Sequence, residues 1–412
     1  MRIHSESAKI KGEEEAMDIK NYGVSECIFM LDCARKYLTP AWIKKLIGEI
    51  ADVGYNAIIL HFSEDMGMRL ESKRYPWLAG GDHNLCVFGI GNGESKNNDK
   101  YISQEEMADI VRFAQSRGVE VIPSFDSPGH MNYIVKKYNE HYGTDIGNYF
   151  HKNGKVSIVH GSSAPKEAIP MSYSRGIDIS NPEAVAFARN LYEEYGRFFA
   201  ELGCKRFVLG GDEILGFGEA IDDSLSKWQN LEHWDELAKE LTGNENAVAY
   251  DAFILYANDI CRMLREMGYE SILMWNDDVY RSFDTGWKGV AELDKEIDIL
   301  YWSDIANGGE NTVRVYLDKG HTVYNLGHEY TYYTLYPDRP PSKVAPEDIL
   351  AEWNPYVFDP KVKDNNPKAP DPRVKGAGIC LWTDTPAAMT EDEILEGIRP
   401  YFTAIAKKAR GV

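Results

Sequence analysis

The chain alternates between short apolar runs and longer segments in which apolar residues recur at helical spacing. Eight runs of five to seven residues have the length of buried β-strands, and each is followed by a segment with the period of an amphipathic helix. The predicted strands lie at 27–31, 56–62, 119–125, 205–209, 271–275, 298–302, 322–326 and 378–382. The predicted helices lie near 40–53, 104–117, 182–202, 246–267, 288–295, 311–319, 346–353 and 390–409.

Local capping chemistry supports several of these helix boundaries. Thr39 stands directly before Pro40, and Asn181 stands before Pro182, which places a capping side chain ahead of a first-turn proline. Ser103 precedes an acidic first turn in the same way. Four glycines close predicted helices just before the next strand, where a left-handed residue commonly ends a helix: Gly118, Gly203, Gly268 and Gly320.

Eight strand–helix units in sequence predict an α/β fold with a parallel sheet, and eight is the number that closes a (β/α)8 TIM barrel. A doubly wound open sheet is the alternative that the pattern leaves open. We expect residues 1–24 to be an N-terminal extension and residues 25–412 to be one catalytic barrel domain. The long loops at 63–103, 126–181 and 354–375 are expected to act as binding walls.

Composition narrows the classes of partner. The chain has 65 acidic and 45 basic residues and a net charge of −20, which argues against nucleic acid and against anionic membrane surfaces. No apolar run has the length of a membrane span. Six dispersed cysteines without a CxxC pair favour free thiols in a reducing compartment, and the polar first 20 residues lack a signal-peptide core. The expected location is cytoplasmic, although a trimmed secreted domain would begin in the same way.

The strongest chemical signal is Gly210-Gly211-Asp212-Glu213 at the end of a predicted strand. Glycines allow a ligand to approach the backbone, and adjacent carboxylates repel, so one of the two acids is expected to have a raised pKa and serve as a general acid. Capping of the following helix is the structural alternative. In a two-carboxylate glycosidase, the acid and the nucleophile lie on opposite sides of the sugar's anomeric carbon. Two acids that are adjacent in sequence cannot easily do so, which points to a substrate that supplies its own nucleophile.

Together with four further segments, this motif resembles the catalytic domain of glycoside hydrolase family 20 β-N-acetylhexosaminidases. Gly210 to Glu213 are similar to that family's Gly-Gly-Asp-Glu, and the other matches occur in the family's order at 31–35, 56–69 with Tyr75-Pro76, 121–130 and 381–384. The resemblance covers most of residues 25–405 and implies a TIM barrel that needs no cofactor and no metal.

The resemblance also implies roles for individual residues. Glu213 would be the general acid and then the base, while Asp212 would orient the substrate's 2-acetamido group so that its carbonyl oxygen attacks. A tyrosine near the seventh strand would contact the acetamide; Tyr330, Tyr332 and Tyr333 crowd that position, and Tyr332 or Tyr333 is favoured. The other implied contacts are hydroxyl binding by Arg35 and Asp384, support of the acid by Asp126 and His130, and a pocket wall made of Trp275, Trp302 and Trp382.

Some positions depart from the family pattern and affect the expected specificity. Ser124 stands where the family often has glutamate, Met68 stands where it has tryptophan, and Asp384 replaces the more usual glutamate. The expected function is removal of terminal β-linked N-acetylhexosamine from oligosaccharides or glycoconjugates. Alternatives are release of a disaccharide as by a lacto-N-biosidase, a non-catalytic carbohydrate-binding barrel, and a metal-dependent hydrolase; the last lacks HxH or HExxH spacing at His61 and His130. The oligomeric state is not predicted.

Overall fold

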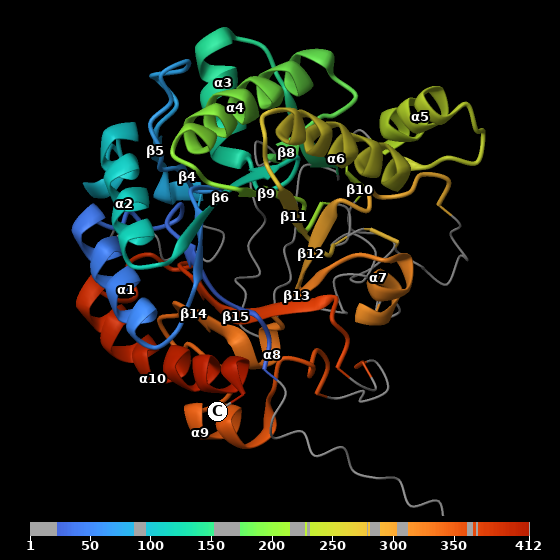
Figure 1. Ribbon diagram of the computed structural model, residues 1–412. Coiled ribbons are helices and arrows are strands. Elements are labelled where there is room, and N and C mark those ends of the chain that lie inside the picture. The colour runs from blue at the N-terminus through green and yellow to red at the C-terminus, as the bar shows by residue number, and fades with distance from the viewer. Residues whose placement is uncertain are drawn as a thin grey trace, which may run out of the picture.

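Eight parallel strand positions close into a barrel in the computed structural model of the chain (Figure 1). The structure describes residues 23–85, 96–151, 174–214, 227–228, 231–277, 279–280, 289–302, 312–360, 366–367 and 370–411. Neighbours follow chain order, and the last strand pairs with the first. The barrel strands are β1 Glu26–Asp32, β2 Ala57–His61, β6 Glu120–Ser127, β9 Arg206–Gly210, β11 Ser271–Trp275, β12 Ile297–Tyr301, β13 Val323–Asn325 and β15 Val374–Trp382. The predicted barrel is therefore confirmed, and the open sheet is excluded.

Helices surround the strands, as the barrel prediction requires (Figure 1). Predicted helices are found as α1 Pro40–Asp52, α2 Gln104–Ser116, α4 Pro182–Glu201, α6 Ala249–Glu266, α7 Val313–Lys319, α9 Pro346–Glu352 and α10 Glu391–Arg410. The side chains of Thr39, Ser103 and Asn181 accept hydrogen bonds from the first turns that follow them, as predicted. Gly118, Gly203, Gly268 and Gly320 all have positive φ. In the part of the chain that the structure describes, three α-helices were not predicted: α3 Asn132–Tyr142, α5 Leu231–Thr242 and α8 His328–Thr331.

The helix predicted near 288–295 is wrong, because residues 289–295 form bends and turns. The backbone N–H groups of Val290 and Ala291 both donate to the Asp251 carboxylate on α6, at 2.9 and 2.8 Å. The N–H groups that would belong to the first turn of a local helix are therefore bonded to a carboxylate of a neighbouring helix.

The seventh position of the barrel is built from two separate strands. β13 pairs with the first part of β15, and β14 (Tyr332–Thr334) pairs in parallel with residues Cys380 to Trp382 further along it. The short helix α8 connects the two. The predicted strand at 322–326 thus covers only the lower half of this wall, and Tyr332 belongs to the upper half.

Side chains alternate between two apolar layers. On β1, Ile28 and Met30 point into the barrel, whereas Phe29 and Leu31 pack toward the helices. The inner layer fills the barrel interior and includes Trp275 and Trp382 at the carboxyl ends of their strands. In barrels of this kind, the functional site lies at that end.

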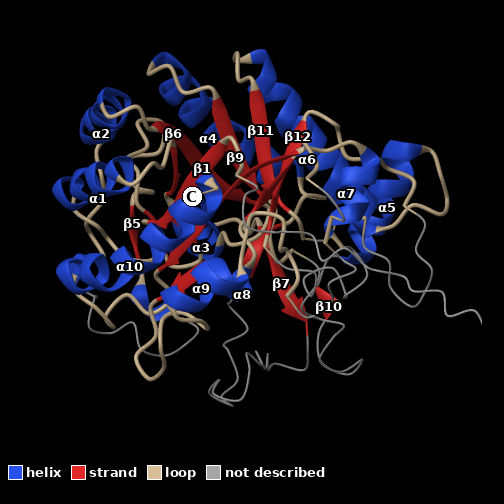
Figure 2. Cartoon of the chain, turned by 60° about the horizontal axis from the view of Figure 1, so that its bottom comes forward, coloured by secondary structure: helices blue, strands red, loops and turns tan. Residues whose placement is uncertain are grey.

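Smaller strands extend the loops outside the barrel. β3 Ser63–Glu64, β4 Gly67–Met68 and β5 Gly80–Gly81 pair with one another, and β7 Gly147–His151, β8 Ser174–Ile177 and β10 Lys227–Trp228 form another small sheet. In Figure 2, β7 and β10 lie apart from the ring of long strands. The N-terminal residues 1–22 and parts of the three predicted long loops (86–95, 152–173, 361–365 and 368–369) lie outside the described residues.

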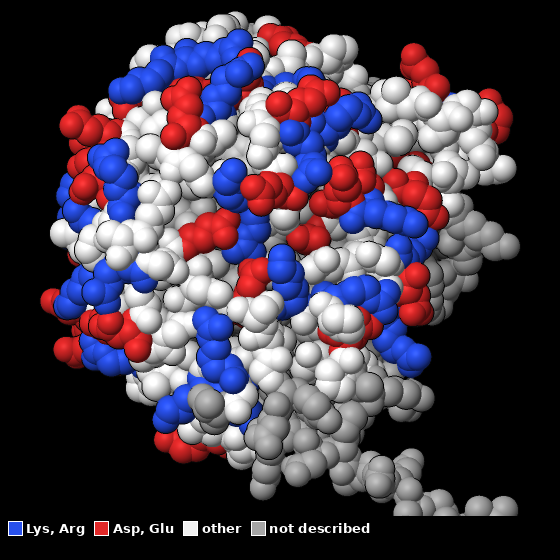
Figure 3. Space-filling view, in the orientation of Figure 1, with Lys and Arg blue, Asp and Glu red and all other residues white. Residues whose placement is uncertain are grey.

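The excess of acidic residues is not gathered on the face shown in Figure 3, where basic and acidic side chains are interspersed. Among the described residues, no helix combines the length and apolar character needed to cross a bilayer.

Candidate active site

Most of the residues predicted for the site lie at or just beyond the carboxyl ends of the barrel strands, which we call the barrel mouth. Because these ends meet at one rim, residues far apart in sequence become neighbours there. The rim carries Asp32 at the end of β1 and Arg35 beyond it, Asp126 near the end of β6 and His130 beyond it, Asp212 and Glu213 after β9, Trp275 at the end of β11, Trp302 after β12, Tyr332 on β14, and Trp382 at the end of β15 with Asp384 beyond it.

His130 connects the two adjacent acids to a third, buried carboxylate. Its Nε2 lies 3.2 Å from Glu213 Oε2 and 3.5 Å from Asp212 Oδ2, and its Nδ1 lies 3.0 Å from Glu64 Oε1. Burial alone would raise the pKa of Glu64, but Arg35 and His130 hold that pKa well below its usual range. Glu64 is therefore a buried anion that orients the imidazole toward Glu213.

Sequence reasoning did not single out Glu64. The available signal was its position three residues after His61, in the Ser63-Glu64-Asp65 turn that follows an apolar strand. β3 and β4 fold this turn back on itself, so that the Glu64 side chain points beneath the mouth.

Asp126 is paired with Asp212 across the gap between β6 and β9. Asp126 is fully buried, and burial together with the nearby Asp212 carboxylate raises its pKa well above the usual range. The N–H of Gly211 donates to Asp126 Oδ1 at 3.1 Å. The sequence predicts a raised pKa within the adjacent pair Asp212 and Glu213; in the structure, Asp126 beside that pair is an acid whose pKa burial and a neighbouring carboxylate raise.

The backbone at these positions is unusual. His130 and Glu213 both have a φ of 49°, which side chains other than glycine adopt rarely. Gly210 has a φ of 85°, and a Cβ there would lie 2.7 Å from the Cα of Asp126. The glycine therefore permits the close approach of β6 and β9 that brings Asp126 to Asp212. Strained residues of this kind concentrate at functional sites.

Arg35 is the cation of the mouth. Its guanidinium lies 2.9 Å from Asp32 Oδ2, 2.5 Å from Glu64 Oε1 and 3.5 Å from Asp384 Oδ1, and 5.3 Å from the ring centre of Trp382. Burial raises the pKa of Asp384 to about 6, with Arg35 lowering it and the neighbouring acids raising it. Three carboxylates thus share one guanidinium.

Aromatic rings continue the rim from β15 to β12. The Trp275 and Trp382 ring centres are 5.8 Å apart, and Tyr332 lies 5.7 Å from Trp382. Trp302 stacks beside Tyr332 with 6.1 Å between ring centres and 13° between planes. The electrostatic influence of Asp212 on the pKa of Tyr332 places this wall next to the paired acids.

The structure separates the tyrosines that sequence reasoning left as alternatives. Tyr333 faces the outer layer, where it packs against Tyr401 at 5.4 Å between ring centres. The Tyr330 hydroxyl donates to Glu352 at 3.1 Å. Tyr332 is the one of the three that joins the inner aromatic wall. The prediction that placed Tyr333 at the site is therefore not supported by its position, because successive residues of a strand point to opposite faces.

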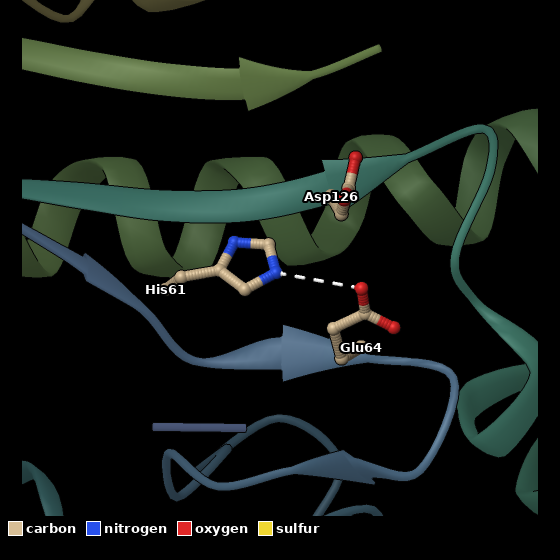
Figure 4. A group of neighbouring side chains, drawn as sticks. All are labelled: His61, Glu64 and Asp126. Atoms are coloured by element: carbon tan, nitrogen blue, oxygen red, sulfur yellow. Dashed lines mark ion pairs between the residues drawn. The ribbon is translucent and has the colours of Figure 1, made fainter. Parts of the chain in front are cut away.

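Two groups of buried side chains present donor atoms that could hold a metal ion: His61, Glu64 and Asp126, drawn in Figure 4, and Glu64, Asp65 and His130. His61 Nε2 lies 3.9 Å from Glu64 Oε1, and His61 Nδ1 lies 2.9 Å from Ser124 Oγ. However, the guanidinium of Arg35 already contacts Glu64 Oε1, and a second cation there would be repelled. These side chains are better suited to hydrogen bonding and proton transfer than to binding a metal ion.

Carboxylates on neighbouring strand ends beside an aromatic wall are the groups that glycosidases use to protonate and hold a sugar. Fold and site together define the class of (β/α)8-barrel glycoside hydrolases. The family model "Glycosyl hydrolase family 20, catalytic domain" matches residues 28–408, and the chain belongs to this family.

Individual relatives are distant. The chain is 25% identical over 362 residues to a lacto-N-biosidase of Bifidobacterium bifidum, covering 87% of this chain and 26% of that protein. It is 24% identical over 328 residues to β-hexosaminidase subunit A1 of Dictyostelium discoideum, covering 77% and 51%. The chain thus spans between about a quarter and a half of the length of these two curated relatives.

Solved structures share the fold. Dispersin B superposes with a TM-score of 0.64 at 22% identity, covering 93% of this chain and 99% of that one. The D437A inactive mutant of a Vibrio harveyi exo-β-N-acetylglucosaminidase gives a TM-score of 0.64 at 19% identity, covering 94% and 54%.

Proposed function

We propose that this chain is a retaining exo-glycosidase that removes terminal β-linked N-acetylhexosamine, GlcNAc or GalNAc, from oligosaccharides or glycoconjugates. The observation that carries the proposal is the different surroundings of two adjacent acids. His130 Nε2 lies near both acids, at 3.2 Å from Glu213 and 3.5 Å from Asp212, but Glu213 influences the pKa of Asp384 whereas Asp212 neighbours Asp126 and Tyr332. One acid is suited to proton transfer and the other to holding a substrate group.

In the proposed reaction, the carboxylic acid of Glu213 protonates the glycosidic oxygen as the bond to the anomeric carbon breaks. The substrate's own acetamide oxygen attacks that carbon and forms an oxazolinium ion. Asp212 accepts the amide N–H and stabilises the positive charge, while the Tyr332 hydroxyl donates to the acetamide oxygen. Glu213, now ionised, removes a proton from the water that reopens the ring at the anomeric carbon, so the β configuration is retained.

Other residues of the mouth have supporting roles in this proposal. Arg35 and Asp384 bind hydroxyl groups of the terminal sugar, and Trp275, Trp302 and Trp382 enclose the sugar and its acetamide. His130, held by Glu64, stabilises the negative charge of Glu213 after proton transfer. No cofactor takes part in these steps.

Release of a disaccharide is a second candidate, favoured by the lacto-N-biosidase relative that aligns with 87% of this chain. The two activities are separated by comparing 4-nitrophenyl glycosides of GlcNAc, GalNAc and lacto-N-biose. Faster turnover of the lacto-N-bioside than of both monosaccharides would identify the second candidate.

The substrate-assisted step is tested by omitting the acetamide. We expect hydrolysis of 4-nitrophenyl GlcNAc, negligible hydrolysis of the matching glucoside, and strong inhibition by a thiazoline analogue of the intermediate. Asp212→Asn should lower kcat roughly 10²–10³-fold because it removes the charge that stabilises the oxazolinium ion. Equal rates on glucoside and GlcNAc substrates would refute the mechanism.

The tyrosine assignment is tested by a matched pair of variants. Tyr332→Phe should lower kcat/KM about 10–100-fold by removing one hydrogen bond to the developing intermediate. Tyr333→Phe, one residue along the same strand, should leave kcat/KM close to that of the unmodified chain. The reverse ranking would reassign the contact.

A further inference from the structure

Trp302 is fixed by a buried carboxylate that the reaction does not itself require. The indole Nε1–H of Trp302 donates to Asp277 Oδ2 at 2.5 Å, and only 2% of Asp277 is exposed. Asp277 lies two residues beyond the end of β11, in the turn that faces the end of β12. Burying a carboxylate is costly unless it makes strong hydrogen bonds. A carboxylate at this place therefore indicates that the orientation of the indole ring is important.

The main chain of Trp302 is anchored from two further sides. Its N–H donates to Asn276 Oδ1 at 2.9 Å, and its carbonyl oxygen accepts the N–H of His328 at 2.9 Å. These bonds fix the backbone, but they leave the ring free to rotate about its side-chain bonds. The Asp277 contact removes that freedom, and it holds the indole within 13° of parallel to Tyr332.

The held ring forms the end of the aromatic wall that begins at Trp382. Tyr332 lies between Trp302 and Trp382, and both Asp212 and Asp277 act on the Tyr332 hydroxyl, whose pKa burial raises well above its usual range. Trp302 is only partly buried, so packing alone does not determine its angle. The angle of this ring sets the space between the wall and the acids.

We propose that Asp277 is a positioning residue that, through the indole N–H of Trp302, sets the width of the acyl pocket and restricts the 2-amido group of the substrate to N-acetyl. The proposal rests on the function proposed above, in which the acetamide lies against this wall. A rigid wall rejects longer acyl chains by steric overlap and holds the shorter one in the orientation for attack.

The test uses 4-nitrophenyl 2-acylamino-2-deoxy-β-glucosides carrying N-acetyl, N-propanoyl and N-butanoyl groups. The unmodified chain should lose kcat/KM steeply with acyl length. Asp277→Ala should lower kcat/KM for the N-acetyl substrate about 10-fold while reducing the discrimination against N-butanoyl by a similar factor, because the freed indole can move aside. Asp277→Asn retains an acceptor oxygen and should keep most of the discrimination, which separates hydrogen bonding from charge.

Trp302→Phe removes the same hydrogen bond from the other side and serves if Asp277→Ala does not fold. Its loss of discrimination should match that of Asp277→Ala, and the double variant should show no additional loss. Tyr316→Phe is the matched control: it removes a 2.6 Å bond from the Tyr316 hydroxyl to the Asn276 carbonyl and loosens the same turn, while the bond from Asp277 to the Trp302 indole stays in place. It should leave the acyl preference unchanged.

Two results would overturn the positioning role. One is an equal loss for all three acyl groups in Asp277→Ala and Trp302→Phe, and the other is a change in acyl preference in Tyr316→Phe as large as that in Asp277→Ala. Failure of the proposed function is recognised separately, because the unmodified chain would then not hydrolyse the N-acetyl substrate.

Discussion

Two buried arginines lie at opposite ends of the barrel and have different surroundings. At the amino ends of the strands, the barrel floor, Arg206 bonds Glu120 at 2.7 Å and also contacts Glu26, while Lys375 joins Glu26 at 3.1 Å. The floor therefore pairs two cations with these two glutamates. At the mouth, the guanidinium of Arg35 faces three carboxylates, those of Asp32, Glu64 and Asp384.

Both arginines have raised pKa values because neighbouring carboxylates outweigh the effect of burial, and the two ends differ in the acids that surround them. At the floor, burial is outweighed by Glu120 and Glu26, and the pKa of Arg206 rises, which stabilises an ion-pair network that closes the barrel. At the mouth, acids outnumber cations, and the pKa values of Asp126 and Asp384 are raised. Excess buried charge is a cost to the fold, and it is concentrated where protons and hydroxyl groups must be handled.

The largest expected effect tests the mouth. Glu213→Gln should lower kcat on a disaccharide substrate roughly 10²–10⁴-fold, because the amide cannot protonate a poor leaving group. The loss should be much smaller on a 4-nitrophenyl glycoside, whose leaving group needs little protonation. The melting temperature should stay near that of the unmodified chain. Equal losses on both substrates would remove Glu213 from the role of acid.

The next effect tests the floor. Arg206→Met should lower the free energy of unfolding by about 1.5–3 kcal/mol, because it removes a buried guanidinium that makes charged hydrogen bonds to two partly buried glutamates, while Lys375 remains on Glu26. Activity per folded molecule should be retained, as measured by chemical denaturation and by kcat on the same samples. Lys375→Met, at a half-exposed member of the same network, should cost only about 0–1 kcal/mol. A loss of kcat in folded Arg206→Met would contradict the division between floor and mouth.

The smallest effect concerns Asp384, where function and stability oppose each other. Its folded-state pKa of about 6 lies above the usual value of about 3.9 for an aspartate, so its contribution to stability is fully present below about pH 4 and is lost as pH rises through about 6. Asp384→Asn removes this dependence and should gain stability relative to the unmodified chain at pH 7.5 but not at pH 4. KM for the sugar should rise about 10-fold through the lost hydroxyl contact. Thermal melts at both pH values provide the check, and parallel pH profiles would count against the shift.

The sequence was sufficient for the barrel because its strands are buried on both faces and therefore appear as continuous apolar runs. The failure near 288–295 came from a long-range contact, since Asp251 takes the backbone donors of that segment. The division of the seventh strand was also hidden, because β14 is only three residues long and follows a one-turn helix.

The predicted site residues that lie at the mouth are those at or directly after a strand end, as Trp382, Asp212 and Glu213 are. Glu64 was missed because its role depends on a tight turn that no apolar pattern marks. Tyr332 could not be chosen over Tyr333 until the strand direction was known, since neighbouring residues reverse faces. The role of Asp277 could not be predicted from the sequence, because its contact with Trp302 crosses between two strands.

The division of the seventh strand position of the barrel between β13 and β14 affects how such sites can vary. β13 bonds to β12 and to the lower part of β15, whereas the pairing of β14 is to β15. Lengthening or shortening α8 by two residues would slide Tyr332 along β15 by about 6.6 Å and keep it on the inner face, while the lower ring of strands kept its register; a single residue would turn it to the outer face. The placement of this tyrosine is therefore adjustable independently of barrel closure, and altered spacing between residues 326 and 332 offers a route to relatives that accommodate differently shaped sugars.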